Sequence, residues 1–280
     1  MNFLNAVLFN PLLQMALLAG FAASIAGGIV GSYVVVKRIV FIAGSISHAV
    51  LGGIGLSVWL AKVHGLTWLS PLEGALAAAI ISALIIGWVH LRYRQREDSI
   101  IAAVWSIGMA VGILLVSQTP GGNLESFLVG NILWVTPADL TLLFILDALV
   151  LFLVLLLHKR FVALCFDPDH ARLQGVSVGG LYMLLLLLIS VSVVLLMEVV
   201  GVVLVLTMLA LPAMLANLFA KRLSAMMGLA VASSLVFCML GMAGAYYLNT
   251  PPSATIALLA GLGYALALWA RRVSTALARR

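Results

Sequence analysis

One histidine lies inside an apolar, glycine-rich stretch, RIVFIAGSISHAVLGGIG, which runs from Arg38 to Gly55. The histidine is His48, and the hydroxyl side chains of Ser45 and Ser47 precede it. A neutral imidazole can bind a metal ion such as zinc, iron or manganese through one ring nitrogen while the other nitrogen makes a hydrogen bond. It can equally pack a helix bundle with its ring bonded to a backbone carbonyl or a hydroxyl. The stretch alone is consistent with both roles.

Two acidic residues are further candidates for contact with a cation. Asp147 lies near the middle of an apolar run, where a carboxylate needs a hydroxyl, an arginine or water as its partner. Glu198 belongs to MEVVG, at a predicted turn between two apolar runs, where it can meet cations or stay solvated. We therefore treat His48, Asp147 and Glu198 as candidates, with the hydroxyl groups of Ser45 and Ser47 beside the histidine.

The other acidic residues of the apolar runs have structural explanations. In SPLE, Ser70 can cap a helix and Glu73 completes a capping box, and TPAD repeats that arrangement further along the chain. Glu97 and Asp98 supply the negative charge that favours a helix start. Glu125 is interpreted as a surface or cap residue.

The composition indicates a membrane protein. Of the 280 residues, 64% are hydrophobic and only 9% are charged, so the chain cannot expose its surface to water. A helix needs about 20 apolar residues to cross the hydrocarbon core, and such runs recur along the whole chain. We predict an all-α, polytopic membrane helical bundle with nine transmembrane helices, or eight if the second or sixth segment does not cross. The predicted segments are residues 12–36, 44–61, 72–90, 99–117, 138–157, 179–197, 201–220, 224–247 and 253–270.

Basic residues accumulate in alternate predicted loops, which orients the chain because such loops are cytoplasmic. The distribution predicts a cytoplasmic C-terminus and, for nine crossings, an external N-terminus; eight crossings would place the N-terminus inside. Only Lys62 lies on the other side. The cytoplasmic groups are Lys37 and Arg38; Arg92, Arg94 and Arg96; Lys159, Arg160 and Arg172; Lys221 and Arg222; and Arg271, Arg272, Arg279 and Arg280.

A pair of glycines in the first segment predicts close helix packing. Gly27 and Gly31 lie four residues apart on one helix face, so another helix can approach closely. The partner helix can belong to the same chain or to a second copy.

The loop between the fifth and sixth segments contains a short helix with both ends specified. In FDPDHARLQGV, Asp167 can cap the helix, Pro168 can start it and Gly175 can end it. Its polar side chains suit contact with a soluble partner, and an ordinary interfacial linker is the alternative. The predicted contact residues are Asp167, Asp169, His170, Arg172, Leu173 and Gly175.

The sequence has no motif for nucleotide binding or catalysis. None of its four lysines follows a glycine, so the Walker sequence GxxxxGK[ST] is missing, and ATP would have to bind another chain. HExxH, CxxC and GxSxG are missing as well. The basic residues form no continuous stripe, which argues against nucleic acid as a partner. We therefore predict that the chain is not an enzyme and holds no permanent cofactor.

Six stretches, taken in order, resemble blocks of one family and together cover nearly the whole chain. The chain resembles the membrane permease of ATP-binding-cassette importers for zinc, manganese or iron. The stretches are GSYVVVKRIVFIAGSISHAVLGGIG, EDSIIAAVWSIGMAVGILLVS, FLVGNILWVTPADL, FDPDHARLQGV, VVGVVLVLTMLALPAMLA and NTPPSAT.

The resemblance implies a single transmembrane permease domain over residues 1–280, with a bundle of the vitamin B12 permease kind and a coupling helix near 167–175. It implies a multi-pass protein of the plasma (inner) membrane of a prokaryote. It also implies three partners besides the lipid membrane: a separate ATPase that binds ATP, an extracytoplasmic metal-binding protein, and a second copy of this chain. The transported substrate would be a divalent metal ion, zinc, manganese or iron.

The chain departs from the family pattern at one position. The family usually has an aspartate four residues before the histidine, and this chain has Gly44 there. The expected pair of carboxylate and imidazole on one helix face is therefore missing. Two other functional classes stay open from the residues: a secondary transporter or channel that works alone, and a structural or assembly protein of the membrane.

Overall fold

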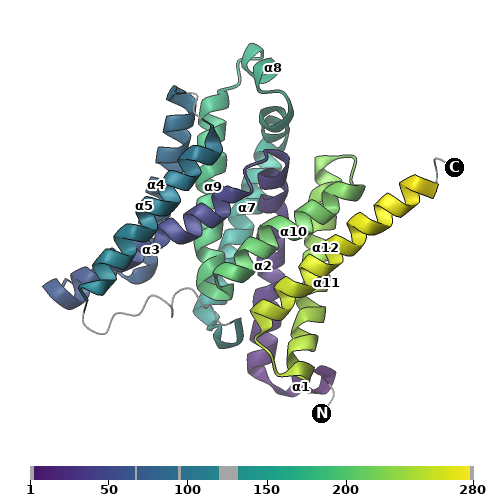
Figure 1. Cartoon of the computed structure of the whole chain (residues 1–280), viewed down its shortest axis with the longest axis horizontal. Helices are drawn as coiled ribbons and strands as arrows, with labels where there is room; N and C mark the ends of the chain where they lie inside the picture. Colours follow the sequence, from purple (N-terminus) through teal and green to yellow (C-terminus); the bar gives the residue numbers. More distant parts are fainter. Residues whose placement is uncertain (1–2, 67, 94–95, 120–131, 278–280) are drawn as a thin grey trace. The chain divides into compact units, whose positions relative to one another are not determined.

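The computed structural model describes residues 3–66, 68–93, 96–119 and 132–277 (Figure 1). Every regular element in these residues is a helix. Nine helices in this part of the chain are long and apolar enough to cross a membrane, which agrees with the predicted nine segments and not with eight. The nine are α2 (Pro11–Val36), α3 (Phe41–His64), α4 (Pro71–Tyr93), α5 (Glu97–Ser117), α7 (Pro137–Phe166), α9 (Val178–Val200), α10 (Val202–Phe219), α11 (Leu223–Leu248) and α12 (Pro252–Leu277). The short elements are α1 (Phe3–Phe9), the 3-10 helix η1 (Ile132–Trp134) and α8 (Pro168–Leu173). The predicted fold class is confirmed.

The predicted capping boxes form at the starts of α4 and α7. The backbone N–H of Ser70 donates to Glu73 Oε2 at 2.7 Å, and the N–H of Glu73 donates to Ser70 Oγ at 3.3 Å. The N–H of Thr136 likewise donates to Asp139 Oδ2 at 2.9 Å. Each box satisfies backbone donors that have no partner within the helix, which is why these acidic residues lie where they do.

The chain divides into two compact units, each made of segments that are distant in the sequence. Unit 1 comprises Met1–Val35, Asn131–Asp147 and Val199–Arg280. Unit 2 comprises Val36–Gly130 and Ala148–Glu198. The description as a single domain over 1–280 stays a prediction.

In unit 1, glycines let α2 pack directly on α10 and α11. A Cβ at Gly31 would collide with the backbone carbonyl of Leu209 in α10, and a Cβ at Gly28 would lie 2.7 Å from the backbone nitrogen of Val231 in α11. Gly27 faces Met208, where an added Cβ would lie 3.4 Å from the methionine Cβ. The glycine pair predicted from the sequence therefore packs helices within the chain.

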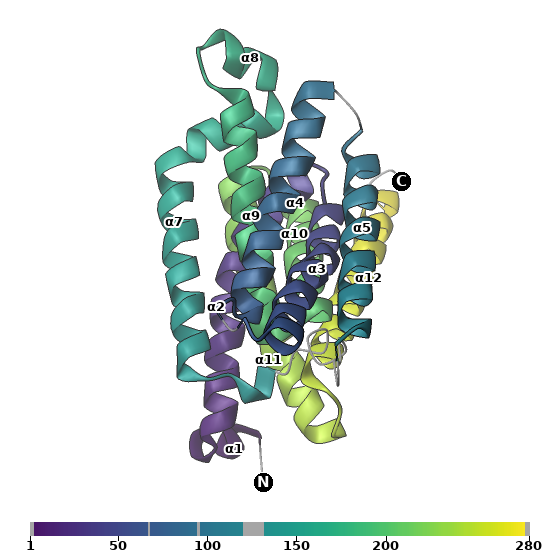
Figure 2. The ribbon, with the colours of Figure 1, turned by 90° about the vertical axis from the view of Figure 1, so that its left-hand side faces the viewer.

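In unit 2, α3 packs between α4 and α5 (Figure 2). A Cβ at Gly74 of α4 would lie 2.5 Å from the carbonyl oxygen of Gly53, and a Cβ at Gly112 of α5 would lie 2.6 Å from that of Leu51. Only hydrogen side chains allow such a backbone approach. The two glycine contacts hold the stretch that contains His48.

Candidate functional site

His48 lies on α3 at its closest approach to α5. A Cβ at Gly108 of α5 would lie 2.5 Å from the Cα of Ala49, the residue next to His48. This contact brings the indole of Trp105, one turn earlier in α5, onto the imidazole. The two rings are stacked, with centroids 4.7 Å apart and planes 6° from parallel.

The stacked imidazole keeps an uncommitted ring nitrogen. Nδ1 of His48 is buried and has no hydrogen-bond partner among the described residues, although the side chain as a whole is partly exposed. Buried polar atoms are nearly always hydrogen-bonded, so an exception calls for an explanation such as a missing water or ion. Stacking fixes the plane of the ring, and Nδ1 is the atom left to bind a transient partner.

The two serines beside His48 already use their hydroxyl protons elsewhere. Ser45 Oγ donates to the carbonyl oxygen of Ile101 in α5 at 2.7 Å, and Ser47 Oγ donates to that of Ala43 at 2.8 Å. Ser45 therefore ties α3 to α5, and Ser47 bonds back within its own helix. Neither satisfies the imidazole, and buried Gly44 contributes no side-chain ligand one turn earlier.

Asp147 is a second buried polar group without a hydrogen bond. It lies in the part of α7 that belongs to unit 1, and its side chain is 5% exposed. Neither Oδ1 nor Oδ2 makes a hydrogen bond of ordinary geometry with the described residues, and the backbone of Ala26 in α2 is the polar group that faces the carboxylate. A carboxylate in that position is costly unless a proton, water or cation accompanies it.

Glu198 has a different environment. It is exposed in the last turn of α9, and it has an interaction within the chain. Gly201, with φ +82°, follows and lets the chain turn into α10. Glu198 therefore lies inside the last turn of α9, three residues before the turn at Gly201, and its predicted contact with cations stays a prediction.

Within either unit of the described chain, these candidates do not form a metal centre of three ligands. In the described ranges, no group of three or more His, Cys, Asp and Glu side chains is placed to hold a metal ion. Ser45, Ser47 and His48 share one helix in unit 2, whereas Asp147 belongs to unit 1.

The predicted short helix is present as α8, with the predicted ends. Asp167 Oδ1 accepts a hydrogen bond from the N–H of His170 at 2.9 Å, and Pro168 is the first helical residue. The N–H of Val176 donates to the carbonyl of Ala171 at 3.1 Å, and Gly175 has a φ of +78°. Both ends are therefore closed by local contacts.

The side chains of α8 divide into an anchoring side and an exposed side. Ala171 is fully buried, whereas the side chain of Leu173 is 87% exposed. Arg172 Nη1 pairs with Asp169 Oδ1 at 3.3 Å, and Gln174 Nε2 lies 2.9 Å from His170 Nε2. The helix thus presents one uncovered leucine within a polar surface.

Comparisons with known proteins identify the family. A model described as the ABC 3 transport family matches residues 10–271. The chain belongs to this family. The family prediction made from the six sequence blocks is confirmed.

Two curated relatives match this chain over nearly its whole length. A probable metal transport system membrane protein of Chlamydia muridarum is 50% identical over 267 residues, which are 95% of this chain and 91% of the relative. A manganese transport system membrane protein, MntC, of Listeria monocytogenes is 32% identical over 268 residues, 95% of this chain and 93% of the relative.

A solved structure has the same fold as this chain. PsaBC from Streptococcus pneumoniae, in complex with Fab, aligns with a TM-score of 0.80 at 27% identity. The alignment covers 95% of this chain and 94% of that chain.

Unit 2 also contains a polar cluster that the sequence analysis does not predict. The Tyr182 hydroxyl in α9 donates to Glu97 Oε1 at 2.8 Å, and His90 Nε2 lies 3.2 Å from the same oxygen. Lys37 Nζ lies 5.8 Å from the centre of the Tyr182 ring and donates to the carbonyl of Leu164 at 3.4 Å. We interpreted Glu97 only as a helix-start residue. The signal available in the sequence is Tyr182, the one aromatic residue of α9.

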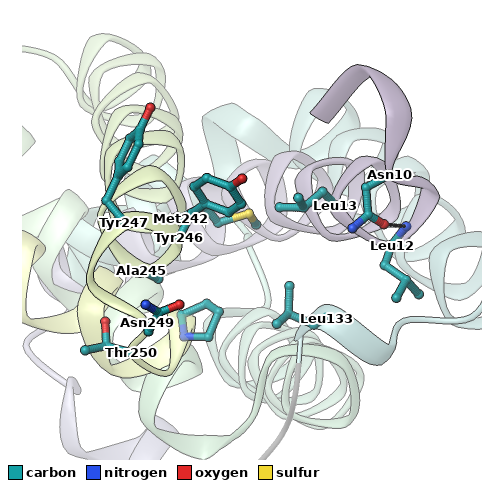
Figure 3. Close-up of a pocket in the computed structure, with 11 residues that line it drawn as sticks. Asn10, Leu12, Leu13, Leu133, Met242, Ala245, Tyr246, Tyr247, Asn249 and Thr250 are labelled. Atoms are coloured by element: carbon teal, nitrogen blue, oxygen red, sulfur yellow. Dashed lines mark hydrogen bonds between the residues drawn. The ribbon is translucent and has the colours of Figure 1, made fainter. Parts of the chain in front are cut away.

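A pocket of ≈ 720 Å³ lies in unit 1, at the end of α11 (Figure 3). Asn249 closes α11 in the left-handed conformation, with φ 52°. Tyr247 Oη accepts a hydrogen bond from the N–H of Phe3 at 3.1 Å, and Asn10 Oδ1 accepts one from the N–H of Leu12 at 3.0 Å. Among the lining residues are Asn10, Leu13, Leu133, Tyr246, Tyr247 and Asn249.

Glu125, which the sequence analysis interprets as a surface or cap residue, lies outside the described residues.

Proposed function

We propose that this chain is the membrane-spanning subunit of an ATP-driven importer of divalent metal ions, with zinc, manganese or iron as the substrate. Membership of the ABC 3 family is the observation that carries the proposal. The names of the Chlamydia and Listeria relatives support metal as the class of substrate and manganese as one candidate.

His48 is the proposed contact between the path and the metal. Its imidazole is a borderline ligand suited to zinc and usable by manganese, and Nδ1 has no other partner among the described residues. The Trp105 ring holds the imidazole in one plane, so an ion would meet a ligand of fixed direction. A single nitrogen binds a divalent ion weakly, which favours passage over storage.

Asp147 is a second proposed path residue. Its two oxygens have no hydrogen bond in the described chain, so a passing cation would supply the missing counter-charge. Ser45 and Ser47 have a lesser role in this proposal. Their hydroxyls donate hydrogen bonds to backbone carbonyl oxygens, and their oxygens are at most weak metal ligands. Glu198, exposed at the end of α9, would meet ions near the mouth of the path.

The helix α8 is the proposed joint with a separate ATPase chain, which would bind and hydrolyse ATP. Exposed Leu173 would enter an apolar hollow of that partner, surrounded by Asp169, His170 and Arg172. Asp167 and Gly175 define the ends of α8, so the helix could transmit movement as a unit.

The proposed orientation follows from the basic loops. With nine crossings, α8 and the C-terminus lie in the cytoplasm, and the N-terminus and the pocket at the end of α11 lie outside. An extracytoplasmic metal-binding protein would deliver the ion at that outer end, and a second copy of the chain would complete the path. The membrane is the plasma membrane of a bacterium.

The path role of His48 is tested by metal uptake per assembled complex. His48→Ala should lower uptake of radioactive manganese or zinc by at least about tenfold, because the lost nitrogen is a metal ligand. The amount of assembled complex should change little, since Nδ1 supports no hydrogen bond. Ser47→Ala is the matched control, because it removes a polar group next door that bonds within its own helix. Normal uptake by His48→Ala would exclude His48 from the path.

The role of α8 is tested by Leu173→Glu. The exposed leucine supports no packing within the chain, so the variant should reach the membrane in normal amount. Its uptake and its co-purification with an ATPase should both fall, because a charge replaces the apolar contact. Undiminished uptake would make α8 an ordinary linker.

A further inference from the structure

A second cavity lies in unit 2, where α7, α8 and α9 meet. It has a volume of ≈ 540 Å³, within the range of about 300–1,000 Å³ that is common for small-molecule sites. In Figure 2, α8 lies beyond the ends of α7 and α9, so the cavity is at the end of the membrane-crossing helices. The path proposed above does not use it.

The lining of this cavity is apolar on the membrane side and polar on the α8 side. Leu157 of α7 and Leu181 and Leu184 of α9 supply the apolar part. Arg160, one turn after Leu157, and Ser177, just before α9, supply the polar part together with the connection from Gln174. A ligand that fits must therefore have an apolar portion and a polar, negatively charged portion.

Arg160 is an exposed arginine at the edge of the cavity. It makes no hydrogen bond or ion pair with the residues that the structure describes. The acidic side chains nearest in sequence are already engaged, since Asp167 caps α8 and Asp169 pairs with Arg172. An anion from outside the chain would supply the missing charge.

The surface of α7 that leads to the cavity suits acyl chains. Phe152, Leu155 and Leu156 have exposed fractions of 62%, 79% and 66%, which in a membrane means contact with lipid. Leu157 and Arg160 follow directly along the same helix. Basic pockets between membrane helices at the interface are suited to anionic lipid head groups.

We propose that the cavity holds one anionic phospholipid from the leaflet that meets α8. The phosphate accepts hydrogen bonds from the Arg160 guanidinium and the Ser177 hydroxyl, and the acyl chains lie along Leu157, Leu181 and Leu184. Such a lipid would fill the junction of α7, α8 and α9. This inference rests on the membrane-spanning character of the chain, and transport activity is not needed to test it.

Lipid retention by the purified full-length chain tests the proposal. Phosphatidylglycerol and phosphatidylcholine would be titrated onto the protein in a nonionic detergent, and bound lipids counted by native mass spectrometry. The wild-type chain should retain one phosphatidylglycerol in preference to phosphatidylcholine. Arg160→Gln should weaken that retention about fivefold.

Lys159→Gln is the matched control, because Lys159 is an exposed neighbour of equal charge that does not line the cavity. It should change retention less than about twofold. Equal effects of the two variants would indicate general surface attraction and overturn the proposal.

Gly180→Leu tests the cavity without changing charge. A Cβ at Gly180 would lie 3.0 Å from Ser177 Oγ, a rotatable group, so α9 should accept the side chain while the cavity fills. Retention should fall as in Arg160→Gln. Unchanged retention by a variant that stays monodisperse would overturn the proposal, as would displacement of the lipid by millimolar glycerol phosphate. Loss of ATPase co-purification in Arg160→Gln with lipid retention intact would assign the cavity to the protein partner instead.

Discussion

Two groups of polar side chains in unit 2 differ in how their hydrogen bonds are satisfied. Around Glu97, the carboxylate accepts from Tyr182 and contacts His90, and Lys37 lies over the tyrosine ring. Around His48, the imidazole stacks on the Trp105 ring, and its Nδ1 has no hydrogen-bond partner among the described residues.

We propose that the difference separates a cluster that stabilises the fold from a residue that takes part in transport. A satisfied cluster links helices that are distant in sequence, here α4, α5 and α9, and it stabilises their packing. An unsatisfied nitrogen contributes no such link and costs free energy unless something transient binds it. The comparison predicts that removing the Tyr182 hydroxyl lowers stability, whereas removing the His48 imidazole lowers transport.

The largest effect should come from Gly108→Val, which breaks the packing behind His48. The valine Cβ would lie 2.5 Å from the Cα of Ala49, so α5 must move away and take Trp105 with it. Overpacking of this kind costs about 1–3 kcal/mol, and we expect a severalfold loss of folded protein in the membrane. Gly228→Val is the control, because no atom lies within 4 Å of an added Cβ there. Equal loss in both variants would attribute the effect to valine itself.

A smaller effect, on metal retention, should follow Gly44→Asp. The new carboxylate would lie one turn before His48 on the same helix and form a two-ligand site. Metal that remains bound after desalting, measured by mass spectrometry of the eluted protein, should rise roughly tenfold. Gly44→Asn has nearly the same shape without the charge and should retain less metal. If both variants match the wild-type chain, the ion does not pass His48.

The smallest effect should come from Tyr182→Phe, which removes one hydrogen bond from the satisfied cluster. The loss should be about 0.5–1.5 kcal/mol, the net contribution of a typical hydrogen bond, because His90 still faces Glu97 in the variant. We expect a lower unfolding temperature and unchanged uptake per assembled complex. Tyr264→Phe is the control, because that hydroxyl makes no hydrogen bond with described residues. Reduced uptake at normal stability would erase the distinction between the two groups.

Local sequence was sufficient for the helices and their ends. The apolar runs predicted nine spans. Eight of the nine helices of the described chain extend them, from 44–61 to Phe41–His64 in α3, for example, and α10 (Val202–Phe219) is two residues shorter than the predicted 201–220. Ser70 and Glu73 predicted a capping box, and Asp167 and Gly175 predicted both ends of α8. These features depend on residues three to eight positions apart, so the chain specifies them without distant contacts.

Only the tertiary structure decided which polar groups are satisfied. Glu97 and Tyr182 are 85 positions apart, and their bond depends on the packing of α5 and α9 in unit 2. From the sequence, the Ser45 hydroxyl could act together with His48. In the structure it donates its hydrogen bond to the carbonyl oxygen of Ile101, 56 positions away. The glycine contacts between α3 and α5 set the second outcome, because the approach of two backbones decides which atoms lie within hydrogen-bonding distance.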